Sequence, residues 1–222
     1  MKKDRRADAV FFGFDFQVNA AIVLMLENIK ELKSLRLESE NEDIDIELYS
    51  GSHILAQAKA IVNSSTDFAH VRTNLKKALE SLSEGSRKVQ TKKLILITNS
   101  PNPLNEDASR SLFWGPAHRG FSTLPESSQK IITDYLSQID QPLDTNQFVI
   151  QVVPFETDDD SEKYKAVMQS INDFIGELKL EIPGIAKQLH RVWCGEAGSS
   201  RAGETTNVPS SSARNRAPGS GS

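Results

Sequence analysis

Two short stretches decide the fold: Glu42-Asp43-Ile44-Asp45-Ile46 and, after one tight turn, Gln57-Ala58-Lys59. Side chains of a β-strand alternate between its two faces. The two aspartates of the first stretch then share one face of a strand, and the two isoleucines share the other. Tyr49–Ser52, which contains a glycine, supplies the turn between the stretches. The sequence therefore predicts an antiparallel hairpin over residues 43–61.

The turn also sets which residues of the hairpin lie opposite each other. If the chain turns around Gly51, positions whose numbers sum to an even total face each other, and Asp43 lies opposite or diagonal to Gln57 and Lys59. An acid, an amide oxygen and an ammonium on one face can together hold a metal ion and a water. This is the layout of a site that cuts phosphodiester bonds. The alternative is an ordinary solvated strand face on which Asp43 and Lys59 form only a salt bridge.

Small residues on the second strand indicate what surrounds it. Ala56, Ala58 and Ala60 alternate with Gln57 and Lys59, so the strand face opposite the polar pair carries only small side chains. We expect a helix to cover that face closely. A long polar pair on a covered, central strand favours a functional role over simple solvation.

Length and composition limit the class of protein. A chain of 222 residues suffices for one domain with a sizeable core and a tail, and 38% hydrophobic residues is usual for a soluble globular protein. The net charge of −4 argues against a protein that coats nucleic acid by bulk charge, though not against a local basic groove. The single cysteine, Cys194, allows no intrachain disulfide and no cysteine zinc site, which fits a cytoplasmic protein. Polar residues interrupt the N-terminal apolar segment, so we expect no signal peptide and no membrane span.

Apolar periodicity predicts the elements outside the hairpin. Helices are expected over residues 15–33, with Asp15 as N-cap, 66–83, 127–139, 160–179 and 183–193. Strands are expected over residues 35–38, 93–98 and 147–154. We expect residues 99–126 to be irregular. Residues 195–222 contain almost no large apolar side chain, which predicts a disordered tail or linker after a domain that spans residues 8–194.

The order of these elements resembles a known nuclease fold. A helix, a strand, the hairpin, a helix and a strand (αβββαβ), with an acid leading the second strand and a polar-x-Lys on the third, is similar to the PD-(D/E)xK nucleases. Gly13-Phe14-Asp15-Phe16-Gln17, Glu38 and the two stretches quoted above also resemble the double-stranded DNA endonuclease domain of CBASS anti-phage effectors. The resemblance implies an α/β fold with a restriction-endonuclease-like core, a mixed sheet flanked by helices, and an extra C-terminal strand and helices.

The resemblance implies a metal-dependent endonuclease that cleaves double-stranded DNA with low sequence specificity in bacterial defence. Asp43 would be the main ligand of Mg²⁺ or Mn²⁺. The spacing alone cannot choose between Asp43 and Asp45, and the family pattern chooses Asp43. The amide oxygen of Gln57 and the carbonyl of Ala58 would complete the protein ligands. Lys59 would orient and help deprotonate the attacking water, or stabilise charge in the transition state.

Two further residues match the family pattern. Glu38 would bind a second metal ion or act through a water. Gln17, on the first helix, either hydrogen-bonds the site or only solvates a helix face.

Basic and aromatic residues outside the motif are candidates for contact with DNA. Arg72, Lys76 and Lys77 lie on the helix after the hairpin, where they either neutralise phosphates or form a solvated face. Phe113 and Trp114 in the irregular segment either touch DNA or serve as packing anchors.

The resemblance also concerns partners. Effectors of this family carry a nucleotide-sensing domain after the nuclease, and nothing after residue 195 here has the composition of one. We therefore expect a sensor domain or protein that is absent from this chain, a homodimer as the arrangement that cuts both strands, and no membrane. The alternative is a catalytically inactive nuclease-fold module that acts as a binding or scaffold subunit of a multi-component system. The acidic pI of about 5.6 and the amide at position 57 favour this alternative.

Overall fold

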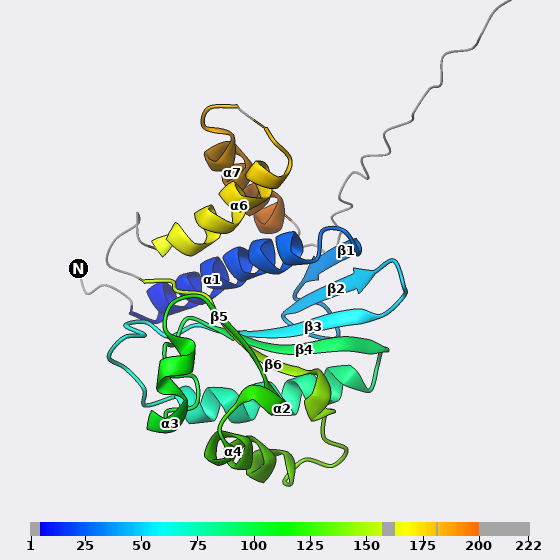
Figure 1. Ribbon diagram of the computed structural model, residues 1–222, viewed down its shortest axis with the longest axis vertical. Coiled ribbons are helices and arrows are strands. Elements are labelled where there is room, and N and C mark those ends of the chain that lie inside the picture. The colour runs from blue at the N-terminus through cyan, green and yellow to red at the C-terminus, as the bar shows by residue number, and fades with distance from the viewer. Residues whose placement is uncertain (1–4, 157–162, 181, 200–222) are drawn as a thin grey trace, which may run out of the picture.

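A six-stranded mixed open sheet forms the centre of the α/β fold, with the strand order β1-β2-β3-β4-β6-β5 (Figure 1). The computed structural model describes residues 5–156, 163–180 and 182–199. The neighbours β3 and β4, and likewise β4 and β6, are parallel, whereas the other neighbouring strands are antiparallel. The strands are β1 Leu32–Leu37, β2 Ile44–Leu48, β3 His53–Lys59, β4 Thr91–Thr98, β5 Ala117–Gly120 and β6 Phe148–Val152.

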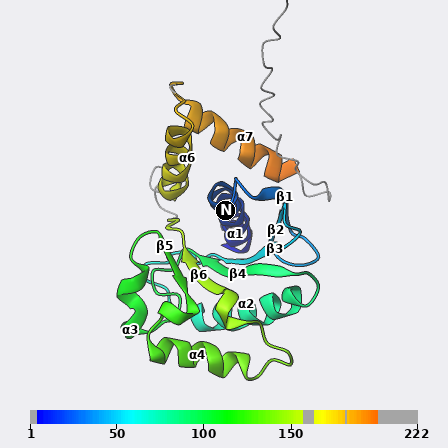
Figure 2. The same cartoon turned by 45° about the vertical axis from the view of Figure 1, so that its right-hand side comes forward.

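Helices cover both faces of the sheet. Helix α1 lies on one face, and α2 and α4 lie on the other, while α6 and α7 stack on the outer side of α1 (Figures 1 and 2). The short helix α3 contacts α4. The helices are α1 Arg5–Glu27, α2 Val71–Ser86, α3 Asp107–Arg110, α4 Glu126–Leu136, α6 Lys165–Glu177 and α7 Ile185–Ser199, with 3₁₀ turns at Ser111–Phe113, Phe121–Thr123 and Thr145–Gln147.

Two apolar cores follow from the alternation of strand side chains. Ile54 and Ala56 of β3 belong to the core under α1, whereas Leu55 between them belongs to the core under α2. A helix therefore covers the alanine face of β3, as the sequence predicted. Burial of each large apolar side chain stabilises the fold by about 1.5–3 kcal/mol, so both helix layers are held on the central strands.

The hairpin has the predicted register. Ile44 lies opposite Ala56 and Asp45 opposite Leu55, so the pairs sum to an even number. Gly51 adopts a φ of 81°, a left-handed conformation that glycine takes without a steric cost. Its N–H donates to the carbonyl of Leu48 at 2.9 Å, which closes the turn.

The prediction of Asp15 as an N-cap was wrong. Helix α1 begins at Arg5, because its apolar face continues upstream: Phe12 is buried and packs on Phe155 with ring centroids 5.4 Å apart. Asp15 lies inside the helix, and its carboxylate accepts a hydrogen bond from the hydroxyl of Tyr164 at 3.0 Å. The helix also ends earlier than predicted, at Glu27, and turns lead into β1.

The second helix begins later than predicted, at Val71. Residues 61–70 form turns instead, in which Asn63 has a φ of 58° and its carbonyl accepts from the N–H of Asp67 at 2.9 Å. Ser64 is fully buried and donates to Glu156 at 3.1 Å. This long-range contact holds the segment as a loop.

The segment 99–126 is more ordered than the sequence predicted. It contains α3 and the edge strand β5, which is only four residues long. So short a strand carries no detectable alternation, and β5 exists because β6 offers it an open edge.

The C-terminal predictions are met in part. Helix α6 lies within the predicted range 160–179, whose first residues fall outside the described ranges. Helix α7 continues to Ser199 and thereby includes residues 195–199, which the sequence assigned to the tail. Residues 200–222 of the predicted tail lie outside the described residues.

Helix α1 contains a long apolar stretch. By length and composition alone, Ala9–Glu27 could cross a membrane, but 61% of it is buried within the fold. A core helix of a globular protein has the same composition, so its burial accounts for the apolar sequence.

The ends of the parallel strands are tied together by one buried amide. Asn99 is only 2% exposed, and its side chain donates to the carbonyls of Ile61 and Phe155, both at 2.9 Å, and accepts from the N–H of Ile61 at 2.8 Å. The hydroxyl of Thr98 donates to the carbonyl of Lys59 at 2.6 Å. The chain leaving β3 is therefore fixed relative to β4 and β6.

Asn99→Ala should lower the free energy of unfolding by at least about 2 kcal/mol, because it leaves buried backbone groups without partners. Chemical denaturation measures this loss. Asn146→Ala, at an exposed position, is the control and should change stability by less than about 0.5 kcal/mol. Equal effects of the two substitutions would show that Asn99 does not tie the strand ends.

Candidate active site

Asp43 stands where the beginning of β2 meets the end of β3. Its Oδ2 accepts hydrogen bonds from the backbone N–H of Ala58, at 3.0 Å, and from the side-chain amide of Gln57. The ammonium of Lys59 lies 3.7 Å from the same oxygen. Three consecutive residues of β3 thus converge on one carboxylate, and the predicted proximity of Asp43, Gln57 and Lys59 is confirmed.

Gln17 and Glu38, the other two residues singled out in the sequence, hold the backbone of Asp43. The side-chain amide of Gln17, on α1, and the backbone N–H of Glu38 both donate to the carbonyl of Asp43 at 2.9 Å. Of the two alternatives for Gln17, the structure has the one in which it bonds to the site: the side chain is buried, not solvating a helix face. Glu38 adopts a φ of 51°, which is uncommon for a non-glycine residue.

A hollow of about 400 Å³ opens beside these residues. Its lining includes Val10 and Phe14 of α1, together with Gln17, Glu38 and Ala58. This volume lies in the range of pockets that accept small ligands or parts of larger ones. Its polar lining residues are Gln17 and Glu38, and the hairpin contributes only Ala58 and Ala60.

Burial and charge act together on Asp43. Burial raises the pKa of this carboxyl group, and the negative charge of Glu38 adds to the rise. The positive charge of Lys59 and the hydrogen bond from Ala58 oppose it. The cost of burying the charged carboxylate of Asp43 is thus offset by contacts that come almost entirely from β3.

The sequence analysis gave no role to Glu42, the residue before Asp43. Glu42 is only 5% exposed, and its Oε2 accepts from the N–H of Asp43 at 3.1 Å. Its Oε1 is buried and has no hydrogen-bond partner among the residues that the structure describes. Burial raises the pKa of Glu42 to about 7, with a contribution from the charge of Asp43. Strand alternation does not reveal this environment, because Glu42 precedes β2 and lines a hollow of about 210 Å³ with Ser81 of α2.

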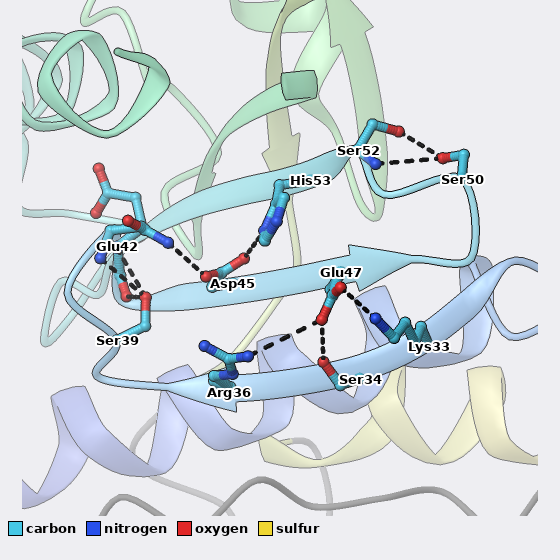
Figure 3. A network of polar contacts seen from close by, with 11 residues as sticks. Lys33, Ser34, Arg36, Ser39, Glu42, Asp45, Glu47, Ser50, Ser52 and His53 are labelled. Carbon is cyan, nitrogen blue, oxygen red and sulfur yellow. Dashed lines mark hydrogen bonds and ion pairs between the residues drawn. The ribbon is translucent and has the colours of Figure 1, made fainter. Parts of the chain in front are cut away.

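Asp45 has a different role from Asp43. It is 2% exposed and pairs with Nδ1 of His53 at 2.7 Å and with the side-chain amide of Asn41 at 2.8 Å (Figure 3). Between β1 and β2, the carboxylate of Glu47 forms an ion pair with Lys33 and contacts other residues of β1 (Figure 3). Of the acids on this face, Asp43 alone reaches the end of β3 within the described residues, so the geometry favours Asp43 over Asp45.

The predicted DNA-binding residues lie along α2. The guanidinium of Arg72 donates to the carbonyl of Asn105 at 3.3 Å, and the ammonium of Lys76 donates to Gln138 at 3.1 Å. Lys77 is exposed. No contact between these three side chains and Asp43 or Lys59 is found in the part of the chain that the structure describes.

The aromatic pair in segment 99–126 divides between the two alternatives. Phe113 is fully buried in the core under α2 and is a packing anchor. Trp114 is 76% exposed, so it is not a packing anchor.

Comparisons with models of protein families, with curated proteins and with solved structures give no match to this chain. Within residues 5–156, 163–180 and 182–199, no three histidine, cysteine, aspartate or glutamate side chains converge as a ready-made metal site. The oxygens near the end of β3 are the carboxylate of Asp43, the side-chain amide of Gln57 and backbone carbonyls, and the carboxylates of Glu38 and Glu42 line the same hollow as Asp43. Such a sparse set fits a hard cation that also takes ligands from water and substrate, and it does not fit a tightly held structural ion.

The raised pKa of Glu42 makes stability depend on pH. The ordinary value is 4.5, so between pH 4.5 and pH 7 the folded protein keeps a proton that the unfolded chain releases. The free energy of unfolding should therefore fall as pH rises through this window, by about 3 kcal/mol in total.

Glu42→Gln should remove this fall, because an amide can accept from the N–H of Asp43 without becoming charged. Thermal or urea unfolding at pH 5 and pH 8 tests the expectation: the variant should gain stability over the wild type at pH 8 and little at pH 5. The exposed Glu80→Gln is the control and should leave the pH dependence unchanged. If Glu42→Gln also leaves it unchanged, Glu42 is not a buried titrating group.

Proposed function

We propose that this chain is a metal-dependent endonuclease that cleaves the phosphodiester bonds of double-stranded DNA with low sequence specificity. The observation that carries the proposal is the convergence of Gln57, Ala58 and Lys59 on the carboxylate of Asp43. The fold supports it, because β1, β2 and β3 form an antiparallel series and β4 runs parallel to β3 after a covering helix. This agrees with the αβββαβ order of the PD-(D/E)xK nucleases.

Mg²⁺ or Mn²⁺ would be held by a small number of protein oxygens. Asp43 would provide the carboxylate, and the amide oxygen of Gln57 and the carbonyl of Ala58 would add neutral ligands. A bound divalent cation supplies positive charge that polarises the phosphate and lowers the pKa of a bound water. Because the site has so few negative ligands, we expect tight metal binding only when a DNA phosphate is also present.

Side chains of the protein would orient the attacking water and stabilise the transition state. Lys59 would orient the attacking water and stabilise the negative charge that develops on the phosphate as the new P–O bond forms and the bond to the leaving oxygen breaks. Asp43 holds the ammonium close to the reacting group, at 3.7 Å from its own Oδ2. Glu38, which lines the hollow of about 210 Å³ together with Asp43, would bind a second metal ion or a water, and Gln17 keeps the backbone of Asp43 in place.

The setting that we propose follows from the family resemblance. The nuclease would act in the cytoplasm of a bacterium against invading phage DNA. Its activating signal would reach it through a nucleotide-sensing domain or protein, and a homodimer would cut both strands. Arg72, Lys76 and Lys77 would contribute contacts to phosphates.

One observation favours the alternative of an inactive binding or scaffold module. Oδ2 of Asp43 already accepts hydrogen bonds from Gln57 and Ala58 and lies near the ammonium of Lys59. Its negative charge is therefore compensated without a metal ion. A nicking assay on supercoiled plasmid, with and without Mg²⁺ or Mn²⁺, separates the two functions. Absence of cleavage under all metal conditions would support the scaffold function.

Lys59→Met should abolish plasmid cleavage and leave the melting temperature nearly unchanged, because a partly exposed ion pair contributes only about 0–1 kcal/mol. Lys92→Met is the matched control: Lys92 also pairs with a carboxylate, at 2.5 Å from Glu31, but at the other end of the sheet. This control should cut at the wild-type rate. A Lys59→Met protein that is folded and fully active would contradict the assignment of Lys59.

A further inference from the structure

A hollow of about 210 Å³ lies between the loop that joins β1 to β2 and the helix α2. Carboxylates dominate its lining, and the acids that line it are Glu38, Glu40, Glu42, Asp43 and Glu84. Among the described residues of the lining, only Lys88 is basic. Its ammonium lies 3.2 Å from Glu84 and donates to the backbone carbonyl of Glu40 at 2.9 Å. The lining therefore carries an excess of negative charge.

One of these acids is buried and lacks a contact for one of its oxygens. Glu42 is only 5% exposed, and its Oε2 accepts from the N–H of Asp43 at 3.1 Å, whereas Oε1 has no hydrogen-bond partner among the residues that the structure describes. The hydroxyl of Ser81, on α2, lowers the pKa of Glu42 but forms no hydrogen bond with Oε1. A buried acceptor of this kind destabilises the fold unless something in the hollow binds it.

The backbone of the loop holds this carboxylate in place. The hydroxyl of Ser39 accepts from the N–H of Glu42 and donates to its carbonyl, both at 3.1 Å (Figure 3). The N–H of Ser39 donates to the same carbonyl at 3.0 Å. The N–H of Glu38 donates to the carbonyl of Asp43 at 2.9 Å. The loop thus presents Glu38 and Glu42 to the hollow from fixed backbone positions.

We propose that this hollow binds a second divalent cation, Mg²⁺ or Mn²⁺, through Oε1 of Glu42 and the carboxylate of Glu38. One or two carboxylates are the usual protein share of a Mg²⁺ site, and waters complete the octahedron. Four waters at about 30 Å³ each occupy about 120 Å³, which a hollow of about 210 Å³ can hold. Glu38 is exposed, so its side chain can turn toward the ion. A site with two carboxylates also agrees with the finding that no three acids converge within the described residues.

The role of this ion rests on the proposed nuclease function, whereas its binding does not. Asp43 lines the same hollow, and Lys59 lies 3.7 Å from Oδ2 of Asp43. An ion in the hollow would add positive charge beside the first metal site, where negative charge develops on the phosphate during cleavage. The first site offers one carboxylate and neutral oxygens, and the hollow offers two carboxylates. We therefore expect the second ion to bind in the absence of DNA.

Binding of Mn²⁺ to the DNA-free protein tests the inference. The electron paramagnetic resonance signal of free Mn²⁺ counts the bound ions, and calorimetry gives their affinity, both at pH 8, where Glu42 with its pKa of about 7 is mostly charged. The wild type should bind one Mn²⁺ per chain. Glu42→Gln should weaken this binding by at least about tenfold, because loss of even an outer-sphere partner of a metal site costs about 10- to 100-fold.

Glu40→Gln is the matched control, because it removes the same charge from the same lining at an exposed position. It should bind Mn²⁺ nearly as the wild type does, since solvent and salt screen an exposed charge. Mn²⁺ should also raise the melting temperature of the wild type and of Glu40→Gln more than that of Glu42→Gln. Melting without metal checks that both variants are folded, and Glu42→Gln retains an acceptor for the N–H of Asp43.

The outcomes separate the inference from the proposed function. Wild-type affinity of Glu42→Gln for Mn²⁺, or equal losses for Glu42→Gln and Glu40→Gln, overturns the inference, and the plasmid assay then decides the nuclease function by itself. Absence of Mn²⁺ binding to the DNA-free wild type overturns it as well. If Mn²⁺ binds through Glu42 and the wild type cuts no plasmid under any metal condition, the cation site stands and the nuclease function fails.

Discussion

The carboxylate of Asp43, held by the last residues of β3, is the contact on which the rest of the site depends. It joins the start of one strand to the end of the next: Gln57 and Ala58 donate hydrogen bonds to it, and Lys59 forms an ion pair with it. The backbone carbonyl of Asp43 is fixed in turn by Gln17 and by the backbone of Glu38. The hairpin, α1 and the end of β1 therefore meet at one residue.

This arrangement keeps ionisable groups where burial disfavours their charged forms. Burial raises the pKa values of Glu42 and Asp43, and Oε1 of Glu42 has no hydrogen-bond partner within the described ranges. A fold selected for stability alone would neutralise or solvate such groups, because an unpaired buried acceptor costs about 1–3 kcal/mol. Perturbed acids gathered in a hollow are typical of functional sites, although ion-pair networks also produce them.

The sequence predicts the hairpin and the proximity of Asp43 to Gln57 and Lys59, because both follow from the two-residue period of strands and from one turn. It does not predict the contacts that hold this hairpin in the molecule. Asn99 bonds to residues far along the chain, and β5 is a strand only because β6 offers it an edge. Asp15 is helical because Phe12 packs on Phe155, a contact that local capping preferences cannot reveal. The separate environments of Asp43 and Asp45 likewise depend on the loop residue Asn41 and on His53.

A crystal of the protein with a short DNA duplex and Mn²⁺ tests the central claim most directly, because anomalous scattering locates the ion without assumptions about activity. The account predicts a peak at the carboxylate of Asp43, beside Gln57 and Ala58 and in contact with a phosphate oxygen. A peak at Asp45 without Asp43, or bound DNA with no ion at the end of β3, would contradict it.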